Sequence, residues 1–166
     1  MNDYMGPALD TTIFAATSAI WLFSRHPEQW DVLREKPALI PNAISEVIRL
    51  ESPIQGFSRV TTQDHEMSGQ TIPEGSRVIV LYGSANRDER QWDNPEQFDV
   101  QRRGVADHLG FGFGEHQCVG NNLARLEIRA LLLALTKRVE KFELLDVEWA
   151  KNNTLHGIAR CEVRIH

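Results

Sequence analysis

The 166-residue sequence predicts a mainly helical fold with a small β-sheet region, organised as one domain. Apolar residues recur every three to four positions near the N-terminus and again after residue 120, which is helical spacing. From Ser52 and Pro53 onward the pattern changes to short strand-like runs parted by glycine and proline turns, and the tail from Phe142 alternates polar and apolar residues. With 42% hydrophobic residues, the chain is long enough to bury one compact core.

The first third of the chain predicts three helices. A buried helix is expected over Met5 to Ser24, with Pro7 either opening it or kinking it, because proline lacks an amide donor and crowds the preceding turn. A short helix follows over Pro27 to Lys36, and Pro41 opens the third. The residues expected on the apolar faces of these helices are Ile13, Ala16, Ile20, Phe23, Trp30, Leu33, Ile44, Val47, Ile48 and Leu50.

The remainder predicts a small sheet, an irregular segment, a long helix and a final strand pair. A short helix over Gly83 to Asp88 leads into an irregular stretch that ends near Arg103, and a loop of that length suggests that it serves a site. The helix over Asn121 to Thr136 carries an apolar stripe formed by Val119, Leu123, Leu126, Ala130 and Leu133. The expected strands are Gly56 to Thr62, Glu66 to Ile72, Arg77 to Leu81, a run around Phe142 to Leu145, and Ile158 to Ile165.

Charge and cysteine content restrict the class of protein. The net charge of −5 argues against a general nucleic-acid binder, because no long basic run offsets it. No apolar run reaches membrane-spanning length and no charged, then apolar leader opens the chain. The two cysteines, Cys118 and Cys161, fit a reducing compartment better than a disulfide scaffold. These features predict a soluble cytoplasmic protein that binds neither nucleic acid nor membrane, and an inert Cys161.

The most informative stretch runs from Phe111 to Gly120 and places Cys118 just before the long helix. Its three glycines suggest a backbone that needs positive φ or passes close to a bulky group. A thiol in the first turn of a helix has a lowered pKa, and the thiolate is the form that ligates metals. The alternative is a buried free cysteine after a glycine-rich turn. A zinc site is disfavoured, since the sequence has no Cys-x-x-Cys and no histidine pair at ligand spacing.

The pattern Phe111-x-x-Gly114-x-His116-x-Cys118-x-Gly120 resembles the haem-binding loop of the cytochrome P-450 monooxygenases. The resemblance implies haem b as cofactor, Cys118 as the proximal thiolate ligand of its iron, and Phe111 as a shield for the sulfur. It also implies that Gly112 and Gly120 lie against the haem and that His116 and Arg59 bind its propionates, a geometry that suits the guanidinium fork. Without the resemblance, Arg59 would be a solvated arginine at a sheet edge.

The segment Gly6-Pro7-Ala8-Leu9-Asp10-Thr11-Thr12 resembles the acid–alcohol segment of the family's distal helix. The resemblance implies that Asp10 and Thr11 relay protons during oxygen activation. Ala8 stands where the family commonly has glycine, and Pro7 would then open the oxygen groove instead. From the residues alone, the alternative is local: threonine hydroxyls often bond back to a carbonyl one turn earlier, and Asp10 can pair with a nearby amide or arginine.

Glu46-x-x-Arg49 places two opposite charges on one helix face. On a surface such a pair contributes only about 0.2 to 0.5 kcal/mol. By its order and distance from the cysteine loop it resembles the family's buried structural ion pair, whose third member comes from a later segment. That segment is Asn94 to Arg102 here, where Gln97 occupies a place often held by arginine and can bond as a neutral partner.

The resemblance covers almost the whole chain and identifies residues 1–166 as the C-terminal part of one bacterial-type cytochrome P-450 domain, without its N-terminal part. It implies insertion of one oxygen atom of O2 into a small organic substrate, with electrons from a ferredoxin-type or flavoprotein donor. Arg125 and Arg129 are either a solvated pair or a docking site for that donor. Substrate contacts are implied near Ile54 to Phe57 and Leu155 to Ile158.

Two alternatives remain open at this stage: a haem binder or sensor without oxygen activation, and an inactive fragment that needs its missing part. The apolar sides of Met5 to Phe23 and Leu123 to Leu135 are expected to face water in so short a chain. Self-association, or purification without properly ligated haem, is therefore expected.

Overall fold

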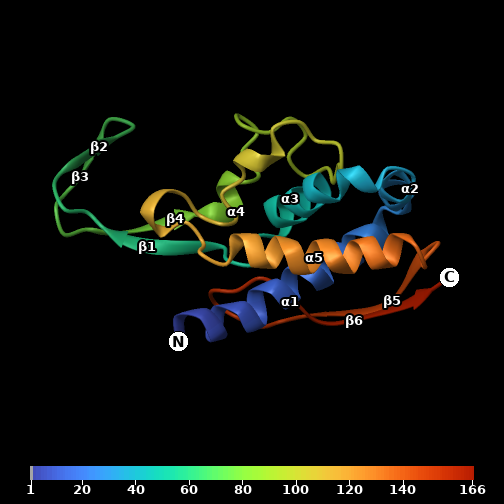
Figure 1. Cartoon of the computed structure of the whole chain (residues 1–166). Helices are drawn as coiled ribbons and strands as arrows, with labels where there is room; N and C mark the ends of the chain where they lie inside the picture. The colour runs from blue at the N-terminus through green and yellow to red at the C-terminus, as the bar shows by residue number, and fades with distance from the viewer. Residues whose placement is uncertain (1) are drawn as a thin grey trace.

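The computed structural model describes the backbone of residues 2–166 and the side chains from residue 9 onward. The predictions that Pro7 opens or kinks the first helix, and that it opens an oxygen groove beside Ala8, concern side chains outside this described part. Helices dominate and three two-stranded sheets complete the fold, which confirms the predicted class (Figure 1). The helices are α1 (Asn2–Arg25), α2 (Pro27–Glu35), α3 (Ile40–Glu51), α4 (Tyr82–Ala85) and α5 (Asn121–Thr136), with short 3-10 turns at Pro37–Leu39, Val105–Asp107 and Gly114–His116.

All strand pairs are antiparallel, and the predicted antiparallel pair at the end of the chain is confirmed. Strand β1 (Gly56–Val60) pairs with β4 (Arg77–Leu81), and β2 (His65–Met67) pairs with β3 (Gln70–Ile72) around Ser68 and Gly69, both at positive φ. The hairpin β2–β3 projects from the end of the β1–β4 ribbon, away from the helices (Figure 1). Strands β5 (Phe142–Trp149) and β6 (Ile158–Ile165) form the final hairpin, which packs along α1.

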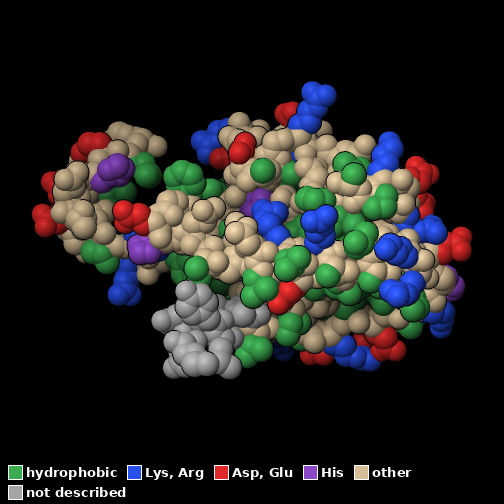
Figure 2. Space-filling model, in the orientation of Figure 1, with side chains coloured by type: hydrophobic (Ala, Val, Ile, Leu, Met, Phe, Trp, Pro, Cys, Tyr) green, Lys and Arg blue, Asp and Glu red, His purple; other side chains and the backbone are tan. Residues whose placement is uncertain are grey.

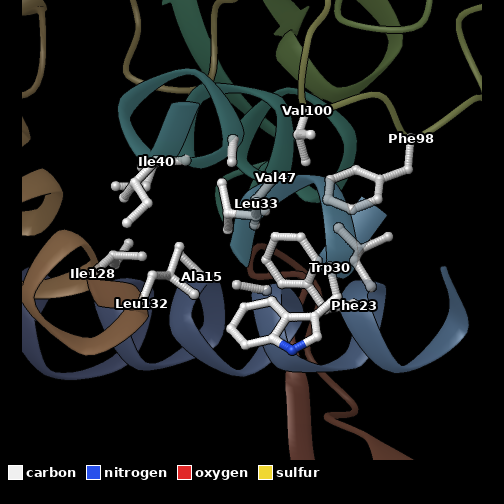
Figure 3. Close-up of a cluster of buried hydrophobic side chains, with 14 of the residues drawn as sticks. Ala15, Phe23, Trp30, Leu33, Ile40, Val47, Phe98, Val100, Ile128 and Leu132 are labelled. Carbon is white, nitrogen blue, oxygen red and sulfur yellow. The ribbon is translucent and has the colours of Figure 1, made fainter. Parts of the chain in front are cut away.

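The core lies where α1, α3 and α5 meet and where α2 closes one end (Figure 3). Trp30 and Leu33 of α2 are buried as predicted, and the Trp30 indole N–H donates to the carbonyl of Val139 at 3.2 Å. Its ring packs against Phe23 and Phe142, with centroids 5.0 and 4.8 Å away. The apolar face of α3 is buried in full. It contains Ile44, Val47, Ile48 and Leu50, the four residues that the sequence placed there.

The predicted burial of α1 and α5 needs correction. In α1 Phe23 is buried as predicted, and Ala16 and Ile20 are partly buried against the core, whereas Ile13 is 57% exposed. The other core-facing residues of α1 are Ala15, Ala19 and Leu22. In α5 the residues that enter the core are Ile128 and Leu132, while the predicted stripe lies largely in solvent, with Leu126 at 61% exposure. Both faces are apolar, so spacing alone could not tell which of them packs against α3.

Large apolar side chains are consequently exposed on α1 and α5, two helices that contact each other. Hydrophobic side chains line the part of α5 that faces the viewer in Figure 2, interrupted by basic groups. Apolar patches larger than a few hundred Å² are rare on monomers. Separately, no helix within the described part of the chain is long and apolar enough to cross a membrane.

We expect these exposed side chains to drive self-association of the chain. Replacing Ile13 and Leu126 together by glutamate should shift the protein toward the monomer, because burying two carboxylates in an apolar contact is unfavourable. Size-exclusion chromatography with in-line light scattering measures the mass. Leu145→Glu, at an exposed leucine of β5, is the matched control and should leave the mass unchanged. A wild-type monomer at all concentrations would contradict the prediction.

Candidate functional site

A cavity of about 470 Å³ opens between α1, the cysteine loop (Phe111 to Gly120) and the start of α5. Helix α1 contributes Thr11, Thr12 and Ala15 to one wall. The other walls are formed by residues of α3 and the segment after it, of β1, of α4, and of the cysteine loop and α5: Ile48, Pro53, Ile54, Phe57, Tyr82, Phe111, Gly112, Glu115, His116, Gln117, Cys118, Val119, Gly120, Leu123, Ala124, Glu127 and Ile128. Its size lies within the range of about 300 to 1,000 Å³ that small-molecule and cofactor sites occupy.

The cysteine loop exposes the thiol of Cys118 at this cavity. The Cys118 N–H donates to the carbonyl of Phe111 at 2.8 Å, so the loop folds back on its own beginning. Cys118 lies three residues before α5, and its carbonyl accepts the Asn121 N–H at 3.3 Å. The prediction that the thiol sits in the first turn of the helix is therefore wrong, because the loop needs one further turn before α5 begins.

The glycines of the loop differ in what requires them. Gly112 and Gly114 have φ of 70° and 72°, a region that side-chain-bearing residues avoid, as predicted. Gly120 has an ordinary φ of −84°, and a Cβ there would lie 3.8 Å from the Cys118 Sγ. A side chain at residue 120 would thus stand beside the sulfur, where the cavity is open.

The structure brings some of the predicted site residues together and leaves others apart. Phe111, Gly112, His116, Cys118 and Gly120 all line the cavity. Arg59 does not belong to the described lining, and its Nη1 donates to the carbonyl of Ser58 at 2.9 Å. Its predicted contact with a haem propionate stays a prediction.

The predicted acid–alcohol pair is also divided. Thr11 lines the cavity together with Thr12, whereas the neighbouring Asp10 is exposed and does not belong to the described lining. A helix turns by about 100° per residue, so consecutive side chains point in different directions. The proton relay stays a prediction, and only Thr11 reaches the cavity directly.

Glu46 and Arg49 form a fully buried ion pair in α3, with Arg49 Nε 2.7 Å from Glu46 Oε2 and Nη2 3.0 Å from Oε1. The third member is Arg102, whose Nε lies 2.9 Å from Glu46 Oε1. Gln97 takes part only through its backbone carbonyl, which accepts from Arg49 at 3.3 Å and from Arg102 at 2.7 Å. The proposed neutral contact through the Gln97 side chain is therefore replaced by an arginine five residues later.

Further hydrogen bonds surround the network, as a buried cluster of two positive charges and one negative charge requires. Arg49 Nη1 donates to the carbonyls of Asn86 and Pro95 at 2.7 and 2.8 Å, and its guanidinium lies over the Trp92 ring at 5.3 Å. Arg102 Nη1 donates to the carbonyl of Asp93 at 2.6 Å. The irregular segment before the cysteine loop is thereby anchored to α3 through its carbonyls.

Asn86 links this network to the segment that enters the cysteine loop. Its side chain is buried, its Oδ1 accepts the Leu109 N–H at 2.7 Å, and its Nδ2 donates to the Ser52 hydroxyl at 2.8 Å. Sequence reasoning did not single out Asn86. An asparagine after a short helix is common at turns, and no pattern signals that its partner lies 23 residues away.

His108 is a second buried polar residue that the sequence did not indicate. Its Nδ1 accepts the Gly110 N–H at 3.0 Å, and its Nε2 lies 3.2 Å from Arg125 Nη2. Burial, and then the positive charges of Arg125 on α5 and Arg49 on α3, lower the pKa of His108 to about 4. The imidazole is therefore neutral at physiological pH.

We expect His108 to make the fold acid-sensitive. Its folded-state pKa of about 4 lies below its ordinary value of 6.5, so the neutral form favours folding. This contribution is fully present above pH 6.5 and is lost as the pH falls toward 4, at a cost of roughly 3 kcal/mol. Denaturant unfolding at pH 7 and pH 4.5 measures it. His108→Asn keeps an acceptor for the Gly110 N–H and should lose less stability on acidification than the wild type. His65→Asn, at an exposed histidine, is the control and should lose as much as the wild type. Equal losses in His108→Asn and the wild type would refute the role of His108.

Comparison with known proteins adds independent information. A sequence model described as cytochrome P450 matches residues 25–160. Cytochrome p450 CYP199A2 from Rhodopseudomonas palustris is 41% identical over an alignment of 166 positions that covers 99% of this chain and 40% of that protein. Linalool 8-monooxygenase from Pseudomonas putida is 38% identical over 155 residues, covering 93% of this chain and 38% of that protein.

Solved structures agree with the sequence comparisons. Cytochrome P450-153 from Novosphingobium aromaticivorans superposes with a TM-score of 0.89 at 36% identity, over 95% of this chain and 40% of that chain. P450BioI, solved in complex with an acyl carrier protein ligated to hexadec-9Z-enoic acid, gives a TM-score of 0.88 at 36% identity, over 93% and 40% of the two chains. The chain thus spans no more than 40% of the length of these relatives. By sequence and by structure, it belongs to the cytochrome P450 family.

Proposed function

We propose that this chain carries the haem-thiolate centre of a monooxygenase that inserts one oxygen atom of O2 into a small organic substrate. The observation that carries the proposal is the exposed Cys118 thiol at a largely apolar cavity that Thr11 and Thr12 also line. Such an arrangement pairs a soft metal ligand with a hydroxyl-bearing pocket for a reactant. Relatives named as monooxygenases support the same reaction class.

The residues around the cavity fit haem b. A thiolate at residue 118 would ligate the iron, and the glycine at 120 keeps a side chain away from the surface beside the sulfur, while Gly112 lines the same cavity. Ile48, Leu123 and Ile128 offer an apolar wall to a flat macrocycle. When bound, haem supplies the activation of dioxygen, a chemistry that no amino-acid side chain provides.

The haem propionates would be bound by His116 and Arg59. His116 already lines the cavity. Arg59 lies two residues after Phe57 in β1, and residues two apart share a strand face, so its side chain reaches the same side as a lining residue once it leaves the Ser58 carbonyl. A carboxylate is a stronger acceptor for a guanidinium than a neutral carbonyl.

Thr11 and Asp10 would deliver protons to the cavity. Thr11 lines the cavity, and exposed Asp10 would connect it to solvent. We expect Thr11→Ala in the haem-loaded, catalytically competent protein to divert reduction from product toward hydrogen peroxide, measured as the ratio of product to electrons consumed. Thr17→Ala, on the same helix but with its hydroxyl bonded to the Ile13 carbonyl, is the control. Unaltered coupling in Thr11→Ala would refute the role.

The cavity lining and the surface charge favour one class of substrate and one class of electron donor. Pro53, Ile54 and Phe57 form an apolar part of the cavity lining, which suits a small hydrophobic compound. Electrons would come from a ferredoxin-type or flavoprotein donor, with exposed Arg129 as a contact for an acidic partner. Two free thiols, Cys118 and Cys161, support a reducing compartment such as the cytoplasm.

Because the chain is expected to be purified without properly ligated haem, the test adds the cofactor: haemin is titrated into the purified chain, and the absorption spectrum of the reduced protein is then recorded with carbon monoxide. A red-shifted carbonyl band, reached at one haem per chain, is expected for thiolate ligation. A carbonyl band without the red shift would indicate that the chain binds haem through a ligand other than a thiolate. Failure to bind haem would indicate that the chain has no cofactor site of its own. Either of these results would overturn the proposal.

A further inference from the structure

Arg125 of α5 is half-buried and bonded to neighbouring segments, whereas the sequence suggested either a solvated arginine or a docking contact for an electron donor. Its Nε donates to Asn121 Oδ1 at 2.7 Å and its Nη1 to the Ser45 hydroxyl of α3, also at 2.7 Å. Its guanidinium lies over the Phe111 ring, 5.0 Å from the centroid. Burial lowers the pKa of Arg125, yet the group stays charged because its ordinary value is far above neutral. Arg129, one turn later, is exposed.

The contacts of Arg125 converge on the start of the cysteine loop. Phe111 receives the guanidinium on its ring and accepts the Cys118 N–H through its carbonyl at 2.8 Å. His108, 5.7 Å from Phe111 between ring centroids, lies beside the same guanidinium. A displacement of Phe111 would therefore move the amide of Cys118 directly.

The donors around His108 determine which hydrogen bonds its ring can make with Arg125. A guanidinium has only donors, and the Gly110 amide is also a donor, so both ring nitrogens of His108 face donors. A neutral imidazole has one acceptor nitrogen and satisfies one of the two. Arg125 thus depends on the Ser45 and Asn121 oxygens and on the Phe111 ring for its remaining partners.

We propose that Arg125 is a positioning residue for Cys118. Its guanidinium, bonded to Ser45 of α3, holds the ring of Phe111 in place as a clamp, and Phe111 in turn sets the position of the thiol at the cavity. The clamp uses the planar shape of the guanidinium, whose fork reaches two oxygens while its face covers a ring. A lysine would keep the charge but not this combination. The clamp concerns the folded chain itself, and its effect on metal ligation rests on the proposed function.

The direct test is hydrogen exchange of the Cys118 amide, measured by NMR on the haem-free chain. Arg125→Lys should lower the protection of this amide by about tenfold, the effect of losing one stacked contact and one hydrogen bond. The amide of Leu132, in the buried part of α5, should keep its protection. Arg129→Lys is the matched control and should change neither amide. Ser45→Ala, which removes one partner of Arg125, should reproduce part of the loss.

A second readout is the reduced carbonyl spectrum of the haem-loaded variants. Arg125→Lys should convert part of the red-shifted band to the ordinary position, while Arg129→Lys keeps the wild-type band. A wild type without a red-shifted band would refute the haem-thiolate proposal but leave the exchange test of the clamp intact. Two results for Arg125→Lys would overturn the clamp. Unchanged protection of the Cys118 amide would show that Arg125 does not position it. Equal losses of protection at the Cys118 and Leu132 amides would show only a general loss of stability.

Discussion

Replacing Cys118 by histidine is expected to abolish the red-shifted carbonyl band of the haem-loaded protein. A thiolate donates electron density to iron, whereas an imidazole is a neutral nitrogen ligand, so the band should return to the position typical of histidine ligation. Cys118→Ser covers the case in which histidine does not fit the loop, and it should lose the band as well. The measurement is the difference spectrum of the reduced protein with and without carbon monoxide.

Cys161→Ser is the matched control for this experiment. Cys161 lies in β6 opposite Val147 of β5, and burial raises the pKa of its thiol, so it is the less reactive kind of cysteine. It does not belong to the described cavity lining. The band should survive in Cys161→Ser. A band retained in both Cys118 variants would show that the ligand is another group and would end the haem-thiolate assignment.

Replacing Glu46 by alanine is expected to lower the free energy of unfolding by about 3 to 5 kcal/mol, because it leaves Arg49 and Arg102 buried without a counter-charge. Glu46 and Arg49 are fully buried, and both arginines donate to Glu46 Oε1. The loss is a large share of the stability of about 5 to 15 kcal/mol that folded domains have. Denaturant titration followed by circular dichroism measures it.

Glu46→Gln keeps an acceptor and removes the charge, so it should lose less stability than Glu46→Ala and stay measurable if the alanine variant does not fold. Glu162→Ala is the control, because Glu162 forms an exposed pair with Arg160 on the hairpin and such pairs contribute little. If Glu46→Ala unfolded at the same denaturant concentration as Glu162→Ala, the buried network would contribute nothing to stability.

The sequence predicted the elements whose signals are local. Prolines at 27 and 41 lie at or near the starts of α2 and α3, and β4 has the predicted bounds, because the residue types at these positions act within one turn or strand. The hairpin β5–β6 followed from alternation in the same way.

The contacts between distant segments were not predictable in this way. Arg102 joins Glu46 across 56 residues, and Arg125 reaches Ser45 across 80. A charged residue looks solvated in sequence unless its partner is known, which is why Arg125 was expected to lie in solvent. The exposure of Leu126 has the same origin, since the side of a helix that enters the core depends on neighbours far away in the chain. The cysteine loop was found only because several of its residue types recur in a known pattern.

The projecting β2–β3 hairpin implies an uneven distribution of opening free energies along the chain. Of its six strand residues only Ile72 is partly covered, and the others are exposed. Segments with few buried apolar contacts open with free energies near zero, whereas core helices open only with the whole fold. A protease that needs an extended substrate would therefore cut between His65 and Ile72 first, and the two products would stay associated through the antiparallel pairing of β1 with β4 and through the helical core.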